Sequence, residues 1–519
     1  MQTSPAGRVL VLTAVAVLLP FAACSGNGGG TTAKESTRNF AAQQLNWEKC
    51  PPPSPAAGGG SAPAPLPGGT EWQCATMEVP RDYAKPNGET IELALIRAPA
   101  RDQSRRIGSL LFNFGGPGGS GTSTLPAAVK DYESLRSRYD LVSFDPRGVG
   151  DSDDVQCESN KQLDAYYAQN AIPDTPREEK TYTDNLKDYA AACKKNSDGL
   201  LPYVGTANAA RDMDLMRQVL GDAKLHYFGI SYGTELGGVY AHLFPDKVGR
   251  AVLDGAVDPT EDAEQSALGQ TRGFQLAMDN FAQDCVNRGD LCLLRGSTRQ
   301  EVEAGIAALL KKLDRKPVPG IGDRQLTATQ AINGIAQALY SKEFWPLLEQ
   351  GIDEAEGGNG ALLLALSDAL NGRSENGMYN NLQAANAAIN CVDSKQRYSL
   401  QQTKAALPRF REASPIFGDY LGWALMTCTH WPVPGQWTTP DVSAPGAPPI
   451  VVVGTTGDPA TPYGGALKLA EELGKGVGRV VTYEGEGHAA YNSGNKCVKT
   501  AVDAYLLNGK VPAEGTTCK

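Results

Sequence analysis

The sequence is poor in histidine and lacks the motifs of common metal sites. Its 519 residues contain four histidines, and neither an H-E-x-x-H motif nor a C-x-x-C pair is present. These absences argue against a metal-dependent hydrolase, a zinc ribbon and a thioredoxin-like redox centre. We therefore expect a site that needs no metal and no other cofactor.

Long apolar runs and an excess of positive charge are also missing. Beyond the N-terminus, no stretch reaches the ~18 consecutive apolar residues that span a bilayer. The net charge is −10 and charged residues make up 20% of the chain. Nucleic-acid backbones are bound by basic surfaces, so we expect no nucleic-acid partner. The 41% hydrophobic content is ample for a globular core larger than one ordinary domain requires.

The one apolar run that is present lies at the N-terminus and predicts export. Residues 9–23 have the length of a secretory signal and end in small residues before Cys24. We predict a signal peptide over 1–23, lipidation of Cys24, and a Gly/Pro/Ser-rich tether over 24–71. Ordinary cleavage after Ala23, without a lipid, is the alternative. The first interpretation puts the protein on the outer face of the cell membrane, with some release to the cell wall or medium.

Cysteine usage agrees with export. Of the 11 cysteines, ten remain if Cys24 carries a lipid, and an even number suits five disulfides in an oxidising compartment. Connectivity does not follow from sequence. The simplest pairing joins sequence neighbours: Cys50–Cys74, Cys157–Cys193, Cys285–Cys292, Cys391–Cys428 and Cys497–Cys518.

From Trp72 onward, short apolar strands alternate with helical segments. Residues 72–80 and 90–98 flank an Asn-Gly turn and predict an antiparallel pair. The later strands are followed by loops and helices, which favours an α/β fold with a mostly parallel sheet. We expect these strands at 109–114, 139–145, 225–230, 251–255, 449–454 and 479–485.

Between roughly 260 and 430 the pattern is rich in Ala, Leu and Gln and has little strand signal. We predict a core in two parts, 72–260 and 431–519, with a mostly helical cap inserted at 261–430. Such a cap would cover the carboxyl ends of the strands, where active sites of parallel sheets lie.

The stretch FGISYG (228–233) contains G-x-S-x-G, a weak signal alone. Ser231, however, ends a predicted strand and opens a predicted helix, as a nucleophile elbow requires. A serine hydroxyl needs a neighbouring base. His226 lies inside the strand before Ser231, and His242 lies far along the helix after it, so neither is well placed.

His488 and Asp458 are better placed to serve Ser231. Each follows a predicted strand, and the order Ser231, Asp458, His488 is that of α/β-hydrolases. The carboxylate would orient the imidazole, which would act as the base. Asp254 is the alternative acid and His430 the alternative base.

Two backbone amides are candidates for the oxyanion hole: those of Gly116, in the loop after a strand, and of Tyr232, the residue after the nucleophile. Pro117 has no N–H to donate. Thr461, followed by proline, is expected to cap the next helix and so to support the loop that carries the acid.

Two other interpretations compete. Gly116–Gly121 also spells G-x-G-x-x-G after a strand, with Asp145 ending the next strand, as in a dinucleotide site. A binding protein that retains an inactive hydrolase fold is the third possibility.

Six segments, taken in order over 72–519, resemble the secreted tripeptidyl aminopeptidases and related cell-envelope lipoprotein proteases. The segments are FGGPGG, DPRGVGDSD, GISYGTELGGVYAHLFPDKVGRAVLDGAVDP, AINCVD, GDPATP and GEGHAAY. Those proteases belong with the prolyl-aminopeptidase-like α/β-hydrolases. The resemblance implies an α/β-hydrolase fold, with Ser231, Asp458 and His488 as triad and Gly116 with Tyr232 as oxyanion hole. Phe114 departs from the histidine that prolyl aminopeptidases usually have there.

The expected function is that of an exported serine peptidase acting on peptides or proteins and releasing short peptides, tripeptides by the resemblance. An endoprotease or a carboxylester hydrolase with the same triad is the alternative. An acidic side chain could pair with a substrate's α-ammonium group. The candidates are Glu235, Glu261, Asp262, Glu264 and Asp393, each of which could equally be a solvated carboxylate.

Overall fold

The computed structural model describes residues 38–519, and Asn39–Lys519 form one unit. The predicted signal peptide and Cys24 lie outside the described residues. Within residues 38–519, no helix is both long and apolar enough to cross a membrane.

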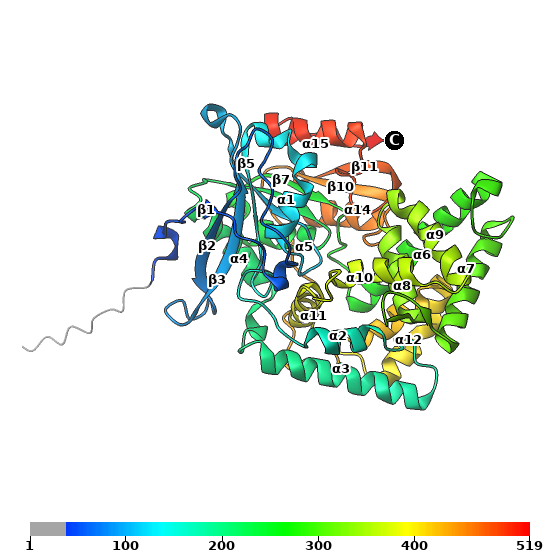
Figure 1. Cartoon of the computed structure of the whole chain (residues 1–519). Coiled ribbons are helices and arrows are strands. Elements are labelled where there is room, and N and C mark those ends of the chain that lie inside the picture. Colours follow the sequence, from blue (N-terminus) through cyan, green and yellow to red (C-terminus); the bar gives the residue numbers. More distant parts are fainter. Residues whose placement is uncertain (1–37) are drawn as a thin grey trace, which may run out of the picture. The chain divides into compact units, whose positions relative to one another are not determined.

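A ten-stranded sheet runs through the described residues in the order β1-β2-β3-β5-β4-β6-β7-β10-β11-β12 (Figure 1). The strands from β5 to β12 in this order are parallel, and β1, β2 and β3 pair antiparallel. The predicted α/β fold with a mostly parallel sheet is confirmed. The strands are β1 Glu48–Lys49, β2 Gln73–Pro80, β3 Thr90–Ala98, β4 Gly108–Asn113, β5 Tyr139–Phe144, β6 Leu225–Ile230, β7 Val248–Asp254, β10 Ile450–Gly457, β11 Gly478–Glu486 and β12 Thr516–Cys518.

Helices cover both faces of the sheet, which explains why its central strands carry apolar side chains on both faces. Successive side chains of a strand point to opposite faces. In β4, Leu110 and Phe112 therefore pack with one set of helices and Leu111 with the other. The first set is α1 (Gly121–Tyr132) and α15 (Lys496–Asn508); the second is α4 (Thr206–Val219), α5 (Tyr232–Leu243) and α14 (Tyr463–Glu472).

The chain between β7 and β10 is mostly helical and has a core of its own, around Phe281, Leu313 and Ile335. We call residues 261–430 the cap. It holds a short hairpin, β8 (Val318–Pro319) and β9 (Gln325–Leu326), and the helices α6 Ala263–Arg288, α7 Arg299–Arg315, α8 Ala328–Leu339, α9 Trp345–Glu356, α10 Ala361–Asn371, α11 Leu382–Asp393, α12 Leu400–Ala413 and α13 Gly418–Trp423.

A second helical insert joins the cap. Helices α2 (Asn160–Tyr167) and α3 (Pro176–Asn196) lie between β5 and β6, and we call them the arm. The sequence pattern assigned them to the hydrolase core. In the structure, Leu186 of α3 packs with Trp423 of the cap, and α2, α3 and α12 lie along the same side of the molecule (Figure 1). A helix between two strands usually packs on the sheet, so the pattern alone could not reveal this role.

The tether prediction differs from the structure over residues 39–71. These residues lie in the same unit as the core. Strand β1 pairs with β2, Leu66 is buried, and the carbonyl oxygen of Ala57 accepts a hydrogen bond from Ser123 Oγ at 2.6 Å. A few apolar anchors, an edge-strand pairing and one disulfide hold a segment whose composition predicted an unfolded linker.

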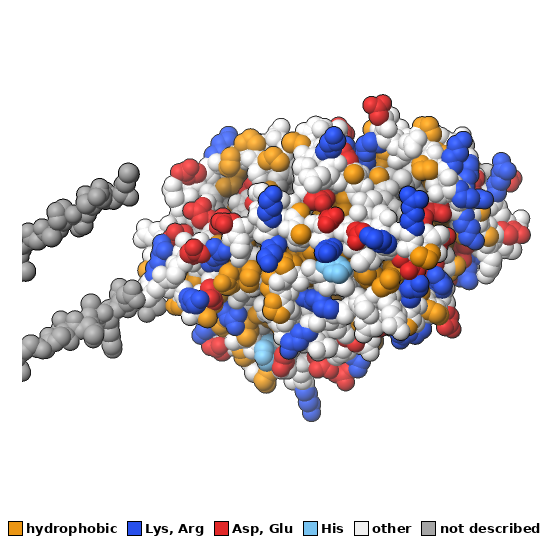
Figure 2. All heavy atoms as spheres, turned by 90° about the horizontal axis from the view of Figure 1, so that it is seen from below, with side chains coloured by type: hydrophobic (Ala, Val, Ile, Leu, Met, Phe, Trp, Pro, Cys, Tyr) orange, Lys and Arg blue, Asp and Glu red, His pale blue; other side chains and the backbone are white. Residues whose placement is uncertain are grey.

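The ten cysteines of the described residues form five disulfides, each between sequence neighbours as the simplest pairing predicts. Cys391–Cys428 links two parts of the cap, and Cys50–Cys74 ties the N-terminal segment to β2. On the face drawn in Figure 2, lysine and arginine side chains are interspersed with aspartate and glutamate rather than gathered in one stripe.

Candidate active site

Ser231 occupies a strained turn between β6 and α5. Its backbone has φ 58° and ψ −126°, a conformation that residues other than glycine rarely adopt. Its N–H donates to the carbonyl oxygen of Asp254 at 3.0 Å. A Cβ atom on Gly229 would lie 2.2 Å from the oxygen of Gly233, and one on Gly233 would lie 2.7 Å from the oxygen of Asn113. The G-x-S-x-G spacing therefore meets a steric requirement of this turn.

Asp458 and His488 meet at the carboxyl ends of β10 and β11. His488 Nδ1 lies 2.9 Å and 3.0 Å from the two carboxylate oxygens of Asp458. The Asp458 side chain is fully buried, and that of His488 is 10% exposed. An ionised carboxylate can only accept, so this contact puts the proton on Nδ1 and leaves Nε2 as the basic nitrogen.

Thr461 supports Asp458 in a way that the sequence pattern did not predict. The helix begins at Tyr463 with Pro462 as its cap, so the predicted capping role of Thr461 is wrong. Instead, the N–H and hydroxyl of Thr461 donate to Asp458 at 2.9 Å and 3.0 Å, and its oxygen lies 3.2 Å from His488 Nδ1. Thr461 thus supports the acid through donated hydrogen bonds rather than through a helix cap.

The pKa of His488 lies above its ordinary value. Burial works to lower this pKa, but the charge of Asp458, its hydrogen bond and the charge of Asp254 outweigh burial and raise it. The carboxylates thus stabilise the imidazolium that forms when His488 takes up a proton.

Asp254, the alternative acid, contacts the backbone beyond His488 instead of its ring. Its two carboxylate oxygens accept from the N–H groups of Ala490 and Tyr491 at 2.9 Å and 2.8 Å. Burial raises its pKa to about 6. Because its carbonyl also holds the N–H of Ser231, Asp254 fixes the nucleophile turn and the histidine loop to one strand end.

The turn of Ser231 and the loop of His488 lie next to each other. A Cβ atom on Gly255 would lie 3.1 Å from His488 Cε1, and Gly255 adjoins the residue that binds Ser231. A Ser231–His488 hydrogen bond is not among those formed within residues 38–519. The other histidines lie elsewhere: His226 Nδ1 accepts from Arg250 N–H, His242 contacts the oxygen of Ser443, and His430 is exposed.

The loop after β4 passes over Ser231. A Cβ atom on Gly115 would lie 2.8 Å from Ser231 Cβ and 3.4 Å from its Oγ. The N–H of Gly115 donates to Asn113 Oδ1 at 3.1 Å. Gly116 and Tyr232 both line the cavity beside Ser231, and neither N–H has a protein acceptor within the described part of the chain. Two backbone N–H groups that face the cavity without a protein acceptor are suited to form an oxyanion hole.

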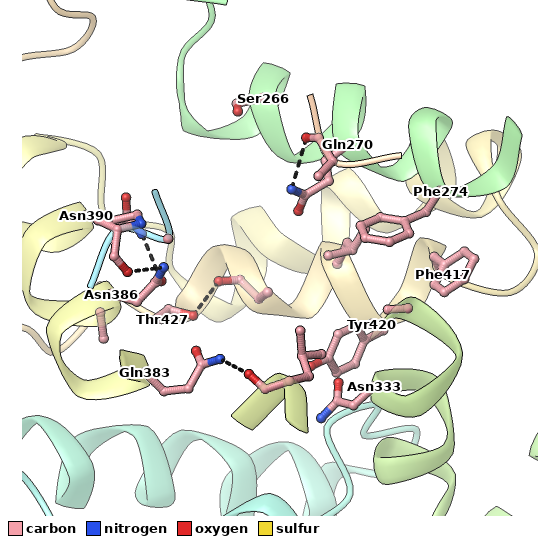
Figure 3. Close-up of a pocket in the computed structure, with 18 of the residues that line it drawn as sticks. Ser266, Gln270, Phe274, Asn333, Gln383, Asn386, Asn390, Phe417, Tyr420 and Thr427 are labelled. Carbon is pink, nitrogen blue, oxygen red and sulfur yellow. Dashed lines mark hydrogen bonds between the residues drawn. The ribbon is translucent and has the colours of Figure 1, made fainter. Parts of the chain in front are cut away.

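Ser231 opens into a cavity of about 670 Å³ between the core and the cap. The arm contributes Tyr166 and Tyr182 to its wall. Figure 3 shows the cap side, where aromatic rings lie among primary amides and hydroxyls from several helices. The labelled residues are Ser266, Gln270, Phe274, Asn333, Gln383, Asn386, Asn390, Phe417, Tyr420 and Thr427. Amides and aromatic rings together suit an extended polar chain such as a peptide.

Comparison with known proteins identifies the family. The family described as TAP-like protein matches residues 414–518, which hold Asp458 and His488. Serine protease Hip1 of Mycobacterium tuberculosis is 38% identical over 492 residues, covering 92% of this chain and 91% of that protein. Tripeptidyl aminopeptidase of Streptomyces lividans is 32% identical over 482 residues, covering 91% of this chain and 86% of that protein. The chain belongs to the TAP-like family of α/β-hydrolases.

Both the resemblance inferred from the motifs and the enzyme class are thereby confirmed. A further TAP-like relative, named carboxylesterase B of Mycobacterium tuberculosis, is 39% identical over 456 residues, covering 86% of each chain. Relatives of similar identity thus carry the names of a protease, an aminopeptidase and an esterase.

In this TAP-like hydrolase the glycine loop and Asp145 are engaged by other parts of the protein, which argues against a dinucleotide site. The carboxylate of Asp145 already accepts from Ser120 Oγ and from the N–H and hydroxyl of Thr122, at 2.9–3.0 Å. A Cβ atom on Gly118 would lie 2.5 Å from the oxygen of Leu382 in the cap. The small residues of the loop serve its packing against α11 and β5, and Asp145 fastens the loop.

The predicted amine-binding carboxylates separate into two groups. Glu235 and Glu261 line the main cavity, and both also line an adjoining cavity of about 350 Å³ together with Asp262 and Asp393. Glu264 instead pairs with Arg409.

Proposed function

We propose that this TAP-like hydrolase is an exported serine peptidase that uses Ser231, His488 and Asp458 and releases short peptides from substrate N-termini. The observation that carries the proposal is the buried Asp458–His488 contact beside a nucleophile turn that opens into a capped cavity. The cap favours exopeptidase action, because a roofed cavity admits a chain end more readily than the middle of a folded chain.

The reaction is acyl transfer in two steps. His488 Nε2 takes the proton of Ser231 Oγ, which attacks the scissile carbonyl while the amides of Gly116 and Tyr232 bind the oxyanion. His488 then protonates the leaving amine, and water repeats the sequence to free the acyl group. Each fixed oxyanion donor contributes about 3–4 kcal/mol to such a transition state.

One experiment tests the reaction. The chain without its signal peptide is incubated with paired free and N-acetylated peptides, alongside a Ser231→Ala variant, and products are read by mass spectrometry. Release of short N-terminal fragments only from free-amine peptides supports the proposal. Equal cleavage of acetylated peptides at internal bonds would make the protein an endoprotease.

Carboxylester hydrolysis is the second candidate, favoured by the relative named carboxylesterase B. Hydrolysis of short acyl esters without cleavage of any peptide would replace the first proposal by this one.

We also propose that Cys24 carries a lipid that anchors the protein outside the cell membrane. Detergent phase partition of the protein from its host, compared with a Cys24→Ala variant, tests this part. Partition of both into the aqueous phase would overturn it.

A further inference from the structure

Glu235 places in the active-site cavity a carboxylate that has no hydrogen-bond or ion-pair partner among residues 38–519. It lies four residues after Ser231, in the first turn of α5, and both residues line the main cavity, about one helical turn or ~5.4 Å apart along the helix axis. Glu235 lines both cavities at their junction, and its half-buried carboxylate makes no hydrogen bond or ion pair with any residue among 38–519. Withdrawing a carboxylate even partly from solvent without a donor costs free energy, which points to a ligand that supplies one.

The surroundings of Glu235 are anionic. Asp393 at the end of α11 and both Asp258 and Glu261 before α6 line the same junction or the adjoining cavity. Among the described residues, no lysine, arginine or histidine lines either cavity. Asp393 is already engaged, since it accepts from the N–H and hydroxyl of Thr206. Glu235 is therefore the inner carboxylate best able to receive a cation.

Burial, followed by the charge of Asp393, raises the pKa of Glu235 to about 8. A cation bound beside Glu235 would lower this pKa again, because an opposite charge favours the ionised carboxylate. The junction also has an apolar wall that fits an alkyl stem, formed by Val257, Ala387, Leu421 and Ala424.

We propose that Glu235 binds an ammonium group that the substrate carries within about two residues of the scissile bond. An extended peptide advances about 3.3–3.6 Å per residue, so one helical turn from Ser231 corresponds to one or two substrate residues. Two sources supply this group: the side chain of a lysine, or the α-ammonium of a peptide cut very close to its N-terminus. The α-ammonium of a tripeptide lies farther from the bond and would need the outer carboxylates. The inference rests on the proposed function for the identity of the substrate.

The first experiment measures binding without requiring peptide cleavage. A fluorophosphonate probe labels Ser231, and n-pentylamine or 1-pentanol of equal chain length competes with it. We expect n-pentylamine to slow labelling of the wild type about tenfold more than 1-pentanol does at equal concentration. A Glu235→Gln variant, which keeps the shape and loses the charge, should show equal protection by the two compounds. Glu375→Gln, at an exposed position, is the matched control and should behave as wild type.

The pH dependence of this protection is a further readout. Protection by n-pentylamine should strengthen between about pH 7 and 9 as Glu235 ionises, while the amine remains protonated. Asp393, Asp258, Glu261 and Tyr232 line the same two cavities, and no lysine, arginine or histidine among residues 38–519 lines them. Burial raises the pKa of Asp393 to about 7, so Asp393 ionises at the lower edge of this pH range. Glu235→Gln should abolish the dependence.

The second experiment distinguishes the sources. Peptides carry lysine or norleucine next to the scissile bond, each with a free or acetylated N-terminus, and kcat/KM is compared for wild type and Glu235→Gln. A tenfold loss confined to lysine peptides assigns the side chain; a loss confined to free-amine dipeptides assigns the α-ammonium.

Equal protection by amine and alcohol in the wild type would overturn the inference, as would equal loss by Glu235→Gln on all substrates. Absence of any peptide cleavage, with amine-selective protection intact, would overturn the proposed function and leave the ammonium site in place.

Discussion

Asp458 holds His488 Nδ1 at 2.9 Å and 3.0 Å through its two carboxylate oxygens, and both partners are withdrawn from solvent. The contact selects one tautomer of the imidazole, the one whose Nε2 lone pair is free to take a proton. Replacing Asp458 by asparagine should lower kcat by about 10⁴-fold without unfolding the protein, because the amide favours the opposite tautomer. Peptidase assays and thermal unfolding of Asp458→Asn check this prediction, and a loss below tenfold would contradict it.

The hydroxyl of Thr461 donates to Asp458 and touches His488, so it orients both. Thr461→Val keeps the volume and removes the donor, and we expect it to lower kcat by about tenfold, the cost of one hydrogen bond to a charged group. Thr461→Ser keeps the donor and should retain most of the activity. Equal activity of the Val and Ser variants would assign Thr461 to packing alone.

On the proposed mechanism, the raised pKa of His488 sets the pH dependence of activity. His488 must be neutral to act as base, so kcat/KM should rise with pH through a pKa above the ordinary 6.5. Proton NMR of the imidazoles measures this pKa directly, and Asp458→Asn should lower it. His226, whose pKa burial lowers to about 4, serves as the internal control and should not respond to the substitution.

The raised pKa of His488 also makes the free energy of unfolding depend on pH. Because the folded pKa of His488 exceeds the unfolded value, its contribution is fully present below about pH 6.5 and is lost as pH rises through the folded pKa. Urea unfolding across this range, compared with a His488→Gln variant, isolates this contribution; parallel curves would contradict it.

Gly233 has no room for a side chain, since a Cβ atom would lie 2.7 Å from the oxygen of Asn113. Gly233→Ala should destabilise the fold by about 2–3 kcal/mol and displace Ser231. Gly464, at the start of α14, meets nothing within 4 Å, so Gly464→Ala should be neutral or stabilising by about 0.5–1 kcal/mol. Urea unfolding of both variants makes the comparison, and equal effects would refute the steric argument.

Trp423 joins the arm to the cap through Leu186 and is 2% exposed. Trp423→Ala should cost about 3–5 kcal/mol of local stability and raise KM, because the arm helps to line the cavity. Leu291→Ala, at a side chain that is 79% exposed, should change stability by less than about 0.5 kcal/mol. Unchanged hydrogen exchange in the arm of Trp423→Ala would contradict the prediction.

The parallel sheet, and the candidate site residues at its edge, can be predicted from local sequence patterns. Apolar strands bounded by glycine turns predict the parallel sheet, and residues after parallel strands meet at one edge. This logic places Ser231, Asp458 and His488 at that edge without any knowledge of packing. The glycines at 229 and 233 are needed because the turn at Ser231 leaves no room for side chains there. This steric requirement involves only six neighbouring residues, so it can be recognised in the sequence itself.

The remaining features depend on packing between distant segments. Composition predicted a tether over residues 39–71, but edge pairing and a disulfide fix it to the core. The helices of the arm have the amphipathic pattern that is common to surface helices, so the sequence does not say which part of the protein they pack against. Only their tertiary contacts assign them to the cap. Glu235 is one of several acidic residues in the sequence. Within residues 38–519 its carboxylate lacks a hydrogen-bond or ion-pair partner because it lies where α5, α11 and the start of α6 meet, which the tertiary structure alone decides.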